Sequence, residues 1–253
     1  MSKFSCDSPF LLTSGNSSKD MHTSREVSKN LYTYAALLAF AAVGSYYGYV
    51  LATTYPNIRV WDIANFALLL LGVPFLWLQS GAHLPNFWQK DIPSRYRIFF
   101  PLGVGLFFGL LDVMVFKLIL HPEPYPELPP FLQPFPYSIF LYLSGAFEVE
   151  VFYRLIPITL VLLWGAHFKN GRYIDAFFWA AAILTSFREP LEQLSGGHWA
   201  LLLYAFLSGF FMNLLQAIFY RKAGFLASMS VRLGHYLLWH ILLGVYVEFV
   251  ELA

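Results

Sequence analysis

Long apolar runs alternate with short polar breaks along most of the chain. A helix needs about 20 largely apolar residues to cross a bilayer. A scan at that length predicts seven such segments, at 31–54, 62–81, 97–120, 137–166, 175–194, 198–220 and 224–249. We therefore predict an all-α fold, a polytopic membrane helix bundle of about seven transmembrane helices, in one domain over 31–253.

The fifth segment is the most interrupted of these. Its apolar run, Ala176–Phe187, has twelve residues, which make about 18 Å of helix. Charged residues and a proline follow at once: Arg188, Glu189, Pro190 and Glu192. This segment either crosses the bilayer with charges inside it or stops partway.

Two stretches do not fit a membrane helix. Residues 1–30 are polar and rich in Ser and Thr, without the apolar core of about 7 to 15 residues that a signal peptide has. We predict that they form a disordered cytoplasmic tail. The stretch "HPEPYPELPPFLQPFP", His121 to Pro136, is crowded with prolines and cannot continue a helix. We predict an external loop of extended character that lies against the membrane surface.

The composition agrees with a membrane protein and excludes other classes. Of the 253 residues, 58% are apolar and only 12% are charged, and soluble domains do not combine these values. The lipid bilayer is therefore a predicted partner. The net charge of +1 comes without a basic patch, so no nucleic acid partner is expected. The single cysteine, Cys6, cannot form an internal disulfide or a thiolate metal site.

The basic residues predict an orientation in the membrane. With seven spans, four basic groups fall on one side, in the tail and after the second, fourth and sixth segments. They are Lys19, Arg25 and Lys29; Lys90, Arg95 and Arg97; Lys169 and Arg172; and Arg221 and Lys222. Basic residues stay on the cytoplasmic side. We therefore predict a multi-pass protein of the cell (inner) membrane with a cytoplasmic N-terminus and an external C-terminus.

The stretch "FEVEVFYRL" places Glu148, Glu150 and Arg154 inside the fourth segment. A charge near the bilayer centre costs roughly 2.5 to 3.5 kcal/mol on insertion scales, so we expect these charges to be paired or to face a cavity. Glu150 and Arg154 are about 40° apart around a helix and are predicted to pair. Glu148 lies about 200° from Glu150, so the two carboxylates point to opposite faces unless a π-bulge intervenes. A purely structural ion pair is one interpretation.

Other polar residues also lie within apolar segments. His235 and Glu150 both fall near mid-depth, on helices that run in opposite directions, and could meet. Arg232, one turn before His235, is predicted to reach the membrane interface. Asn213 and Gln216 are predicted to hydrogen-bond across helices. Lys117 is predicted to lie at the membrane interface and His240 to be a hydrogen-bonded structural residue, while Asp112 has no assigned role.

These side chains are suited to one kind of chemistry. A carboxylate in a cavity of low dielectric constant can accept a proton from water, while Arg and His can stabilise the oxyanion formed at an attacked carbonyl. Together they would allow peptide hydrolysis without a covalent intermediate. The sequence contains no nucleophile elbow, phosphate loop or zincin motif that would indicate another reaction.

Two stretches resemble a known family. "FEVEVFYRLIPI" and, three helices later, "AIFYRKAGFLASMSVRLGHYLLWHIL" are similar to the first and last motif regions of the CAAX-protease and bacteriocin-processing (CPBP) family of glutamic-type intramembrane proteases. That family's first motif is two glutamates, three variable residues and an arginine, and Glu150 and Arg154 match its second glutamate and its arginine. Its last motif is a histidine with Asn or Asp four residues later, and His235 matches the histidine. The resemblance covers about 137–253.

The chain departs from the family pattern at three positions. Val149 stands where the first glutamate would be, and Glu148 is one residue too early. The family's middle motif is a phenylalanine with a histidine four residues later; if Phe187 is that phenylalanine, Leu191 replaces the histidine. Trp239 replaces the final Asn or Asp. These departures leave open whether the chain is catalytic.

The resemblance implies an intramembrane endopeptidase that acts on a membrane-anchored peptide or protein. In this hypothesis Glu150 or Glu148 activates water, His235 stabilises the oxyanion and Arg154 orients a carboxylate. Two alternatives remain: a catalytically inactive relative that binds or scaffolds partner membrane proteins, and a small transporter. These side chains are too few to predict a metal site. The sequence therefore leaves open whether the protein requires a metal ion or another cofactor.

Overall fold

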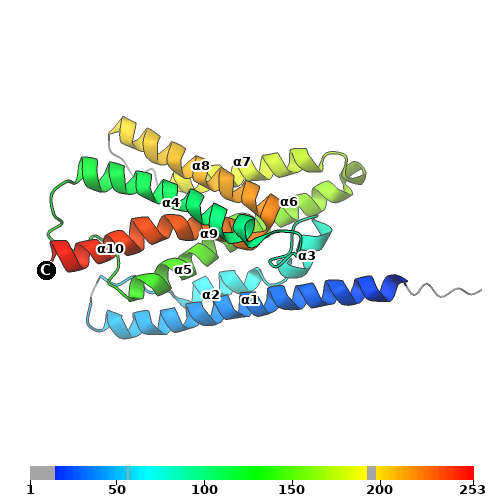
Figure 1. The fold of residues 1–253 in the computed structure, drawn as a ribbon, viewed down its shortest axis with the longest axis horizontal. Helices are drawn as coiled ribbons and strands as arrows, with labels where there is room; N and C mark the ends of the chain where they lie inside the picture. The colour runs from blue at the N-terminus through cyan, green and yellow to red at the C-terminus, as the bar shows by residue number, and fades with distance from the viewer. Residues whose placement is uncertain (1–14, 56, 193–197) are drawn as a thin grey trace, which may run out of the picture.

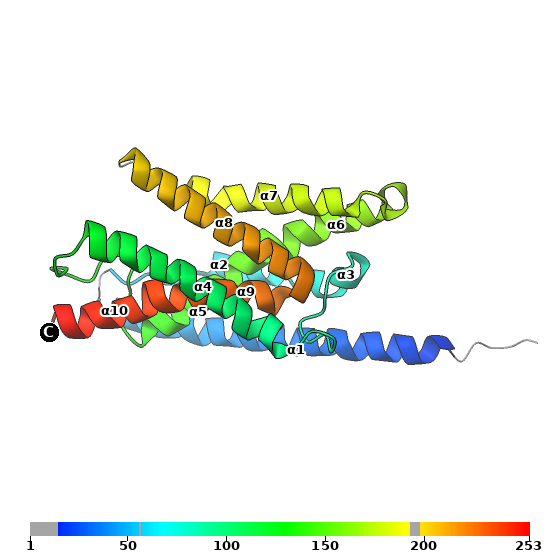
Figure 2. The same cartoon turned by 45° about the horizontal axis from the view of Figure 1, so that its top comes forward.

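The helices lie side by side and form an elongated bundle. A computed structural model describes residues 15–55, 57–192 and 198–253, and this part of the chain contains helices and loops but no strand. One side of the bundle is α1 (Gly15–Ala52), and the opposite side is α7 (Ile174–Glu192) and α8 (Trp199–Ala223), as Figure 1 shows. The two sides remain apart when the view is turned by 45° (Figure 2).

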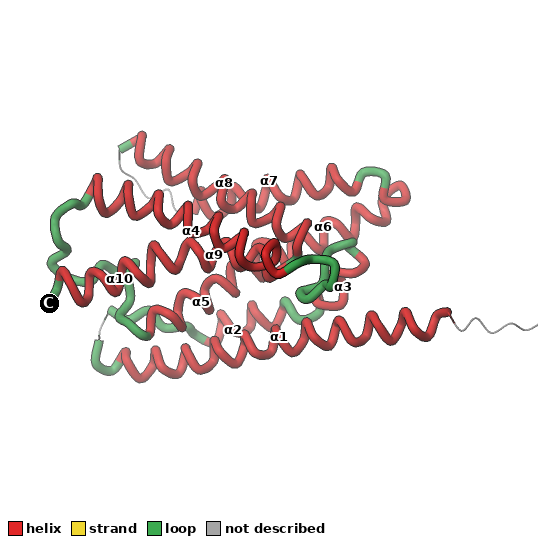
Figure 3. The backbone as a smooth tube through the Cα atoms, viewed as in Figure 1, coloured by secondary structure: helices red, strands yellow, loops and turns green. Residues whose placement is uncertain are grey.

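Between these sides lie α4 (Phe100–Asp112), α5 (Tyr137–Glu150) and α9 (Phe225–Tyr236). α5 packs against α1, α9 packs against α4, α5 and α8, and α7 packs against α8. The other elements are α2 (Ile63–Leu71), α3 (Phe75–Gly81), η1 (Arg95–Phe99), η2 (Val113–Leu120), η3 (Val151–Leu155), α6 (Ile156–His167), η4 (Phe168–Gly171), η5 (Leu237–Leu242), α10 (Leu243–Tyr246) and η6 (Val247–Glu251). Most loops gather at the two ends of the bundle (Figure 3).

The prediction of an all-helical fold is confirmed. Five helical stretches in the described part are long and apolar enough to cross a membrane: Val27–Ala52, Ala64–Gly81, Arg95–Leu120, Trp199–Ala223 and Phe225–Glu251. The predicted segments 137–166 and 175–194 are also helical, the second over its described residues 175–192, but they are not among these five, and each carries several charged residues. The count of about seven spans is therefore not confirmed.

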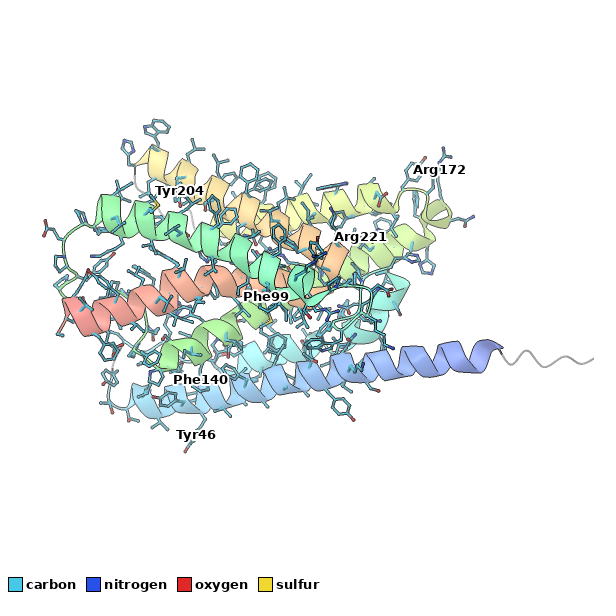
Figure 4. All side chains as sticks on the ribbon, in the orientation of Figure 1. Tyr46, Phe99, Phe140, Arg172, Tyr204 and Arg221 are labelled. Carbon is cyan, nitrogen blue, oxygen red and sulfur yellow. The ribbon has the colours of Figure 1, made fainter. Side chains whose placement is uncertain are left out.

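The outer surface of the bundle is apolar. Tyr46, which points away from α1 in Figure 4, is 73% exposed. Other large apolar side chains that are more than half exposed include Leu70, Phe107, Leu184 and Phe249. Soluble monomers rarely expose large contiguous apolar patches. This surface and the apolar helices fit a multi-pass membrane protein.

The first helix begins earlier than the sequence analysis predicts. α1 begins at Gly15, so residues 15–30 are helical, and the prediction of a disordered tail is wrong for that part. Residues 1–14 lie outside the described residues. The apolar stretch after residue 27 supplies the helix nucleus, and adding residues to an existing helix costs far less than starting one. Polar residues such as Lys and Glu, which are good helix formers, then extend it.

The proline-rich stretch 121–136 packs onto one end of the bundle. It contains no regular helix, as its prolines predict. Leu132 is 1% exposed and packs with Leu243 and Val247. The buried Gln133 accepts a hydrogen bond from the Arg59 backbone N–H at 3.0 Å. The apolar centre of this part of the loop is therefore buried among the helices. The position of the loop against the membrane surface stays a prediction.

Two glycines allow α4 and α9 to approach each other closely. A Cβ atom added at Gly105 of α4 would overlap the backbone oxygen of Val231 on α9. A Cβ atom added at Gly234 of α9 would overlap the backbone oxygen of Leu102 on α4. Small residues at a helix interface permit such close backbone contact in membranes. This contact places Asp112, at the end of α4, beside His235 of α9.

Replacing Gly105 with alanine is expected to destabilise the protein by about 1 to 3 kcal/mol, because the added methyl group forces α4 and α9 apart. The loss should appear as a lower midpoint of thermal unfolding in detergent micelles. Gly103 is the matched control on the same helix, since a Cβ there would meet nothing within 4 Å. If Gly105→Ala and Gly103→Ala lower the midpoint of thermal unfolding equally, the close approach of α4 and α9 at Gly105 is contradicted.

Candidate functional site

The predicted pair of Glu150 and Arg154 forms in the interior of the bundle. Both side chains are 0% exposed, and Arg154 Nε lies 4.0 Å from Glu150 Oε2. The Gln216 amide donates to Glu150 Oε1 at 2.6 Å, and the Ser228 hydroxyl donates to Glu150 Oε2. Gln216 lies on α8 and Ser228 on α9. The Glu150 carboxylate is therefore enclosed by three helices.

Arg154 is held mainly by amide oxygens of α8. Its Nη2 donates to the Asn213 side chain at 2.5 Å, to the Asn213 backbone oxygen at 3.1 Å and to Gln216 Oε1 at 2.9 Å. The prediction that Asn213 and Gln216 hydrogen-bond across helices is confirmed. Breaking such a buried pair leaves an uncompensated charge.

A π-helical turn sets the position of Arg154. η3 covers Val151–Leu155 and ends two residues before Pro157. Proline has no backbone N–H and cannot donate to the carbonyl four residues earlier, so the regular helix is disturbed in the turn before it. The same arrangement occurs at η1, Arg95–Phe99, before Pro101. The π turn starts after Glu150 and therefore does not bring Glu148 to the same face.

A second set of polar side chains lines a cavity of about 300 Å³. Arg232 and Glu189 form a bidentate pair on its wall, with both arginine terminal nitrogens 2.6 Å from the carboxylate oxygens. Arg232 is 1% exposed, so the prediction that it reaches the membrane interface is wrong. It instead neutralises Glu189, which α7 brings into the cavity next to Pro190.

His235 lies on the same cavity and is paired with Asp112. Its Nε2 is 2.7 Å from Asp112 Oδ2, and the Tyr204 hydroxyl donates to Asp112 Oδ1 at 2.7 Å. A carboxylate only accepts hydrogen bonds, so the imidazole Nε2 carries the proton. His235 is 8% exposed, and its Nδ1 is buried without a hydrogen-bond partner among the described residues. A neutral imidazole in this tautomer has a basic Nδ1.

Glu148 lines a separate cavity of about 280 Å³. Asn65 of α2 donates to its Oε1 at 2.8 Å, and Arg59 and Val149 lie on the same wall. Glu148 and Glu150 therefore point to opposite faces of α5, as their spacing predicts. His240 lines both cavities, and its Nδ1–H donates to the Phe131 backbone oxygen at 2.8 Å.

The four predicted site residues are thus distributed over three places. Glu150 and Arg154 lie together in the core, His235 lines the larger cavity and Glu148 lines the smaller one. Neither Glu150 nor Arg154 lines either of these two cavities. The core pair is nevertheless connected to the larger cavity, because Gln216 Oε1 accepts from Arg154 and, at 3.1 Å, from Arg232.

Comparisons with known proteins give no match: no family model matches the chain, and no curated protein or solved structure does. The function is therefore inferred from the geometry. Among the described residues, no group of three or more His, Cys, Asp or Glu side chains is placed to hold a metal ion.

The positions that depart from the family pattern have different surroundings. Leu191, in place of the middle histidine, is 57% exposed, whereas Glu189, two residues earlier, enters the cavity. Trp239, in place of the final amide or acid, lines the cavity and stacks on Phe131 with ring centroids 5.1 Å apart. Val149 faces the smaller cavity beside Glu148.

The sequence analysis does not place three residues of the larger cavity in the site: Asp112, Glu189 and Arg232. A signal existed for Arg232, which is three residues before His235 and therefore on the same helix face. Glu189 and Asp112 were visible as charges within apolar segments. Their partners could not be read from spacing, because each partner lies on another helix.

Proposed function

We propose that the protein is an intramembrane peptidase that hydrolyses a peptide bond of a membrane-anchored substrate in the larger cavity. The observation that carries this proposal is that the Asp112–His235 pair and the Glu189–Arg232 pair line the same cavity. Its volume of about 300 Å³ lies at the lower end of the range for ligand sites. The resemblance to the CPBP family supports the same reaction class.

In this proposal His235 is the general base. Asp112 holds the Nε2 proton, so that the Nδ1 lone pair accepts a proton from water as the water oxygen adds to the substrate carbonyl carbon. Nδ1 is buried in the structure, so this step requires a side-chain movement that opens Nδ1 to the cavity. The proton then passes to the leaving nitrogen when the carbon–nitrogen bond breaks. Arg232 stabilises the oxyanion, and Glu189 fixes the guanidinium in place. Glu150 and Arg154 support the cavity wall through Gln216.

This assignment differs from the one made from the sequence. Glu150 is 0% exposed and bonded to Gln216 and Ser228, which leaves it no approach to water in the cavity. Glu148 lies in a cavity of its own. The base role therefore moves to His235, and Arg154 becomes a positioning residue.

We further propose that seven segments cross the membrane, with the N-terminus on the cytoplasmic side. Arg172 and Arg221 lie toward the end of the molecule from which α1 extends (Figure 4). Glu248 and Glu251 lie near the C-terminus and accept hydrogen bonds from backbone N–H groups of the loop 121–136, Phe135 to Glu248 and Tyr125 to Glu251. This distribution of charge supports the predicted orientation.

A partner-binding protein without catalytic activity is the second candidate. It is favoured by the pairing of each charge: Glu150, the strongest match to the family's first motif, is enclosed with Arg154, and Glu189 is enclosed with Arg232. Buried ion pairs of this kind can specify how helices pack without any catalytic role.

The two candidates are separated by a hydrolysis assay in water enriched in ¹⁸O. The purified protein in lipid vesicles is incubated with membrane-anchored peptides of varied sequence, and products are analysed by mass spectrometry. The peptidase predicts two shorter products with one ¹⁸O atom in the new carboxyl group. Intact peptides with the folded protein, across the whole collection, would favour the partner-binding protein.

A further inference from the structure

A basic groove lies near the N-terminal ends of two apolar helices. It has a volume of about 640 Å³ and runs between α1 and the loop that leads into η1. Its main lining residues are Lys29, Tyr32, Trp88, Lys90, Ser94 and Arg97. None of the described residues that line it is acidic. The basic groove therefore has three positive charges and no countercharge on its walls.

The cations of the basic groove have no carboxylate partner within the described part of the chain. Arg97 is 6% exposed; its Nη2 donates to the Gln89 and Ile92 backbone oxygens, and its Nε is buried without a hydrogen-bond partner. These hydrogen bonds to neutral carbonyl groups do not neutralise the guanidinium charge. Lys29 and Lys90 are exposed at the rim. An anion bound in the groove would therefore lie near the side chains of Lys29, Lys90 and Arg97.

The basic groove is built from fixed parts. The Trp88 indole N–H donates to the Thr33 hydroxyl at 2.7 Å, and the Phe87 backbone N–H donates to Asn30 at 3.1 Å. These bonds attach the loop to α1. The Arg97 guanidinium lies 5.4 Å from the Trp88 ring, a distance that allows a cation–π contact.

The groove lies at the level where apolar helices begin. Lys29 is two residues inside the apolar stretch Val27–Ala52, and Arg97 is two residues inside Arg95–Leu120. Lipid headgroups lie at this level when those helices cross the bilayer. Trp and Tyr side chains, of which the groove has Trp88 and Tyr32, are enriched at such interfaces.

An apolar groove continues directly from the basic one. It has a volume of about 580 Å³ and shares Ile92 and Pro93 with the basic groove. It runs between α4 and α8, and most of its lining is apolar: Ile92, Tyr96, Phe100, Leu215, Ile218 and Phe219. Two charged residues, Asp91 and Lys222, also line it. A molecule with an anionic head and an apolar chain would match both grooves at once.

We propose that these grooves bind one anionic phospholipid, with its phosphate on Lys29, Lys90 and Arg97 and an acyl chain against Phe100 and Phe219. Basic pockets between membrane helices recognise lipid headgroups in this way. The apolar groove selects a lipid over a soluble phosphate, because only a lipid fills both parts. This site is separate from the cavity of the proposed peptidase and does not depend on it.

The test uses the full chain in a zwitterionic detergent, titrated with phosphatidylglycerol or with phosphatidylcholine of the same chains, and follows the midpoint of thermal unfolding. The variant Lys29→Gln with Lys90→Gln removes two exposed cations. We expect it to weaken the apparent affinity for phosphatidylglycerol about fivefold per cation, or roughly 25-fold, and to leave that for phosphatidylcholine unchanged. Arg97→Gln should also weaken phosphatidylglycerol binding.

The matched control removes two exposed cations from the turn after α6, with Lys169→Gln and Arg172→Gln, and should change the affinity less than twofold. Equal affinity for the two lipids, or an equal loss in the control, would overturn the proposal. Glycerol phosphate is not expected to compete with the lipid. If it competes as well as the whole lipid does, a soluble phosphate is the ligand and the assignment to a lipid is wrong.

Discussion

Replacing His235 with glutamine is expected to lower the rate of peptide cleavage at least 100-fold while the protein stays folded. Glutamine can still donate an N–H to Asp112, which His235 contacts at 2.7 Å, but it has no basic nitrogen. Positioned general bases contribute about 10²- to 10⁴-fold. The measurement is the initial rate of product formation from a peptide that the wild-type protein cleaves, together with the midpoint of thermal unfolding.

His167→Gln is the control for this prediction. His167 ends α6, is exposed, and its Nδ1 lies 2.8 Å from the Leu163 backbone oxygen, away from the larger cavity. It should cleave at the wild-type rate. If His235→Gln is as active as His167→Gln, His235 is not the base, and another group must take the proton from water.

The second large effect concerns stability. Arg154→Met should lower the free energy of unfolding by about 3 to 5 kcal/mol, because it leaves the Glu150 carboxylate buried without its cation. Methionine keeps much of the side-chain length, so the loss reports mainly the charge and its hydrogen bonds. The measurement is unfolding by heat or denaturant in detergent micelles, at equal protein and detergent concentrations.

The chain offers a matched ion pair as the control. Arg188 and Glu192 have the same four-residue spacing, with an Nε–Oε1 distance of 3.0 Å, but their side chains are 49% and 54% exposed. Arg188→Met should therefore cost less than about 1 kcal/mol. Similar losses of unfolding free energy for Arg154→Met and Arg188→Met would show that burial does not increase the contribution of the Glu150–Arg154 pair to stability.

The helical architecture could be predicted from the sequence because it follows from local patterns. Apolar runs of sufficient length gave helices close to the predicted bounds, for example Arg95–Leu120 for 97–120. Spacing alone gave the pair of Glu150 and Arg154 and the opposite direction of Glu148. The helical part of the tail, residues 15–30, was missed because the scan searched only for apolar length.

The ion pairs that line the larger cavity could not be predicted in the same way, because the two residues of each pair lie on separate helices. His235 meets Asp112 of α4, and Arg232 meets Glu189 of α7. Arg232 lies deeper in the bundle than the sequence predicts, because the start of an apolar segment does not coincide with the surface of the protein. In the structure Phe225, the first residue of α9, is already fully buried and stacks on Phe87. The loop that carries Phe87 covers this end of the helix.

We expect the polar residues to form a dry core around Glu150 and a water-accessible cavity around His235. The most direct test is thiol labelling in a background without Cys6, the only native cysteine. Ser208→Cys lies on the cavity wall, and Ser228→Cys replaces the 0% exposed hydroxyl that contacts Glu150. We predict that a water-soluble thiol reagent modifies position 208 in the folded protein and position 228 only after unfolding. Rapid modification at 228, or none at 208, would contradict the account.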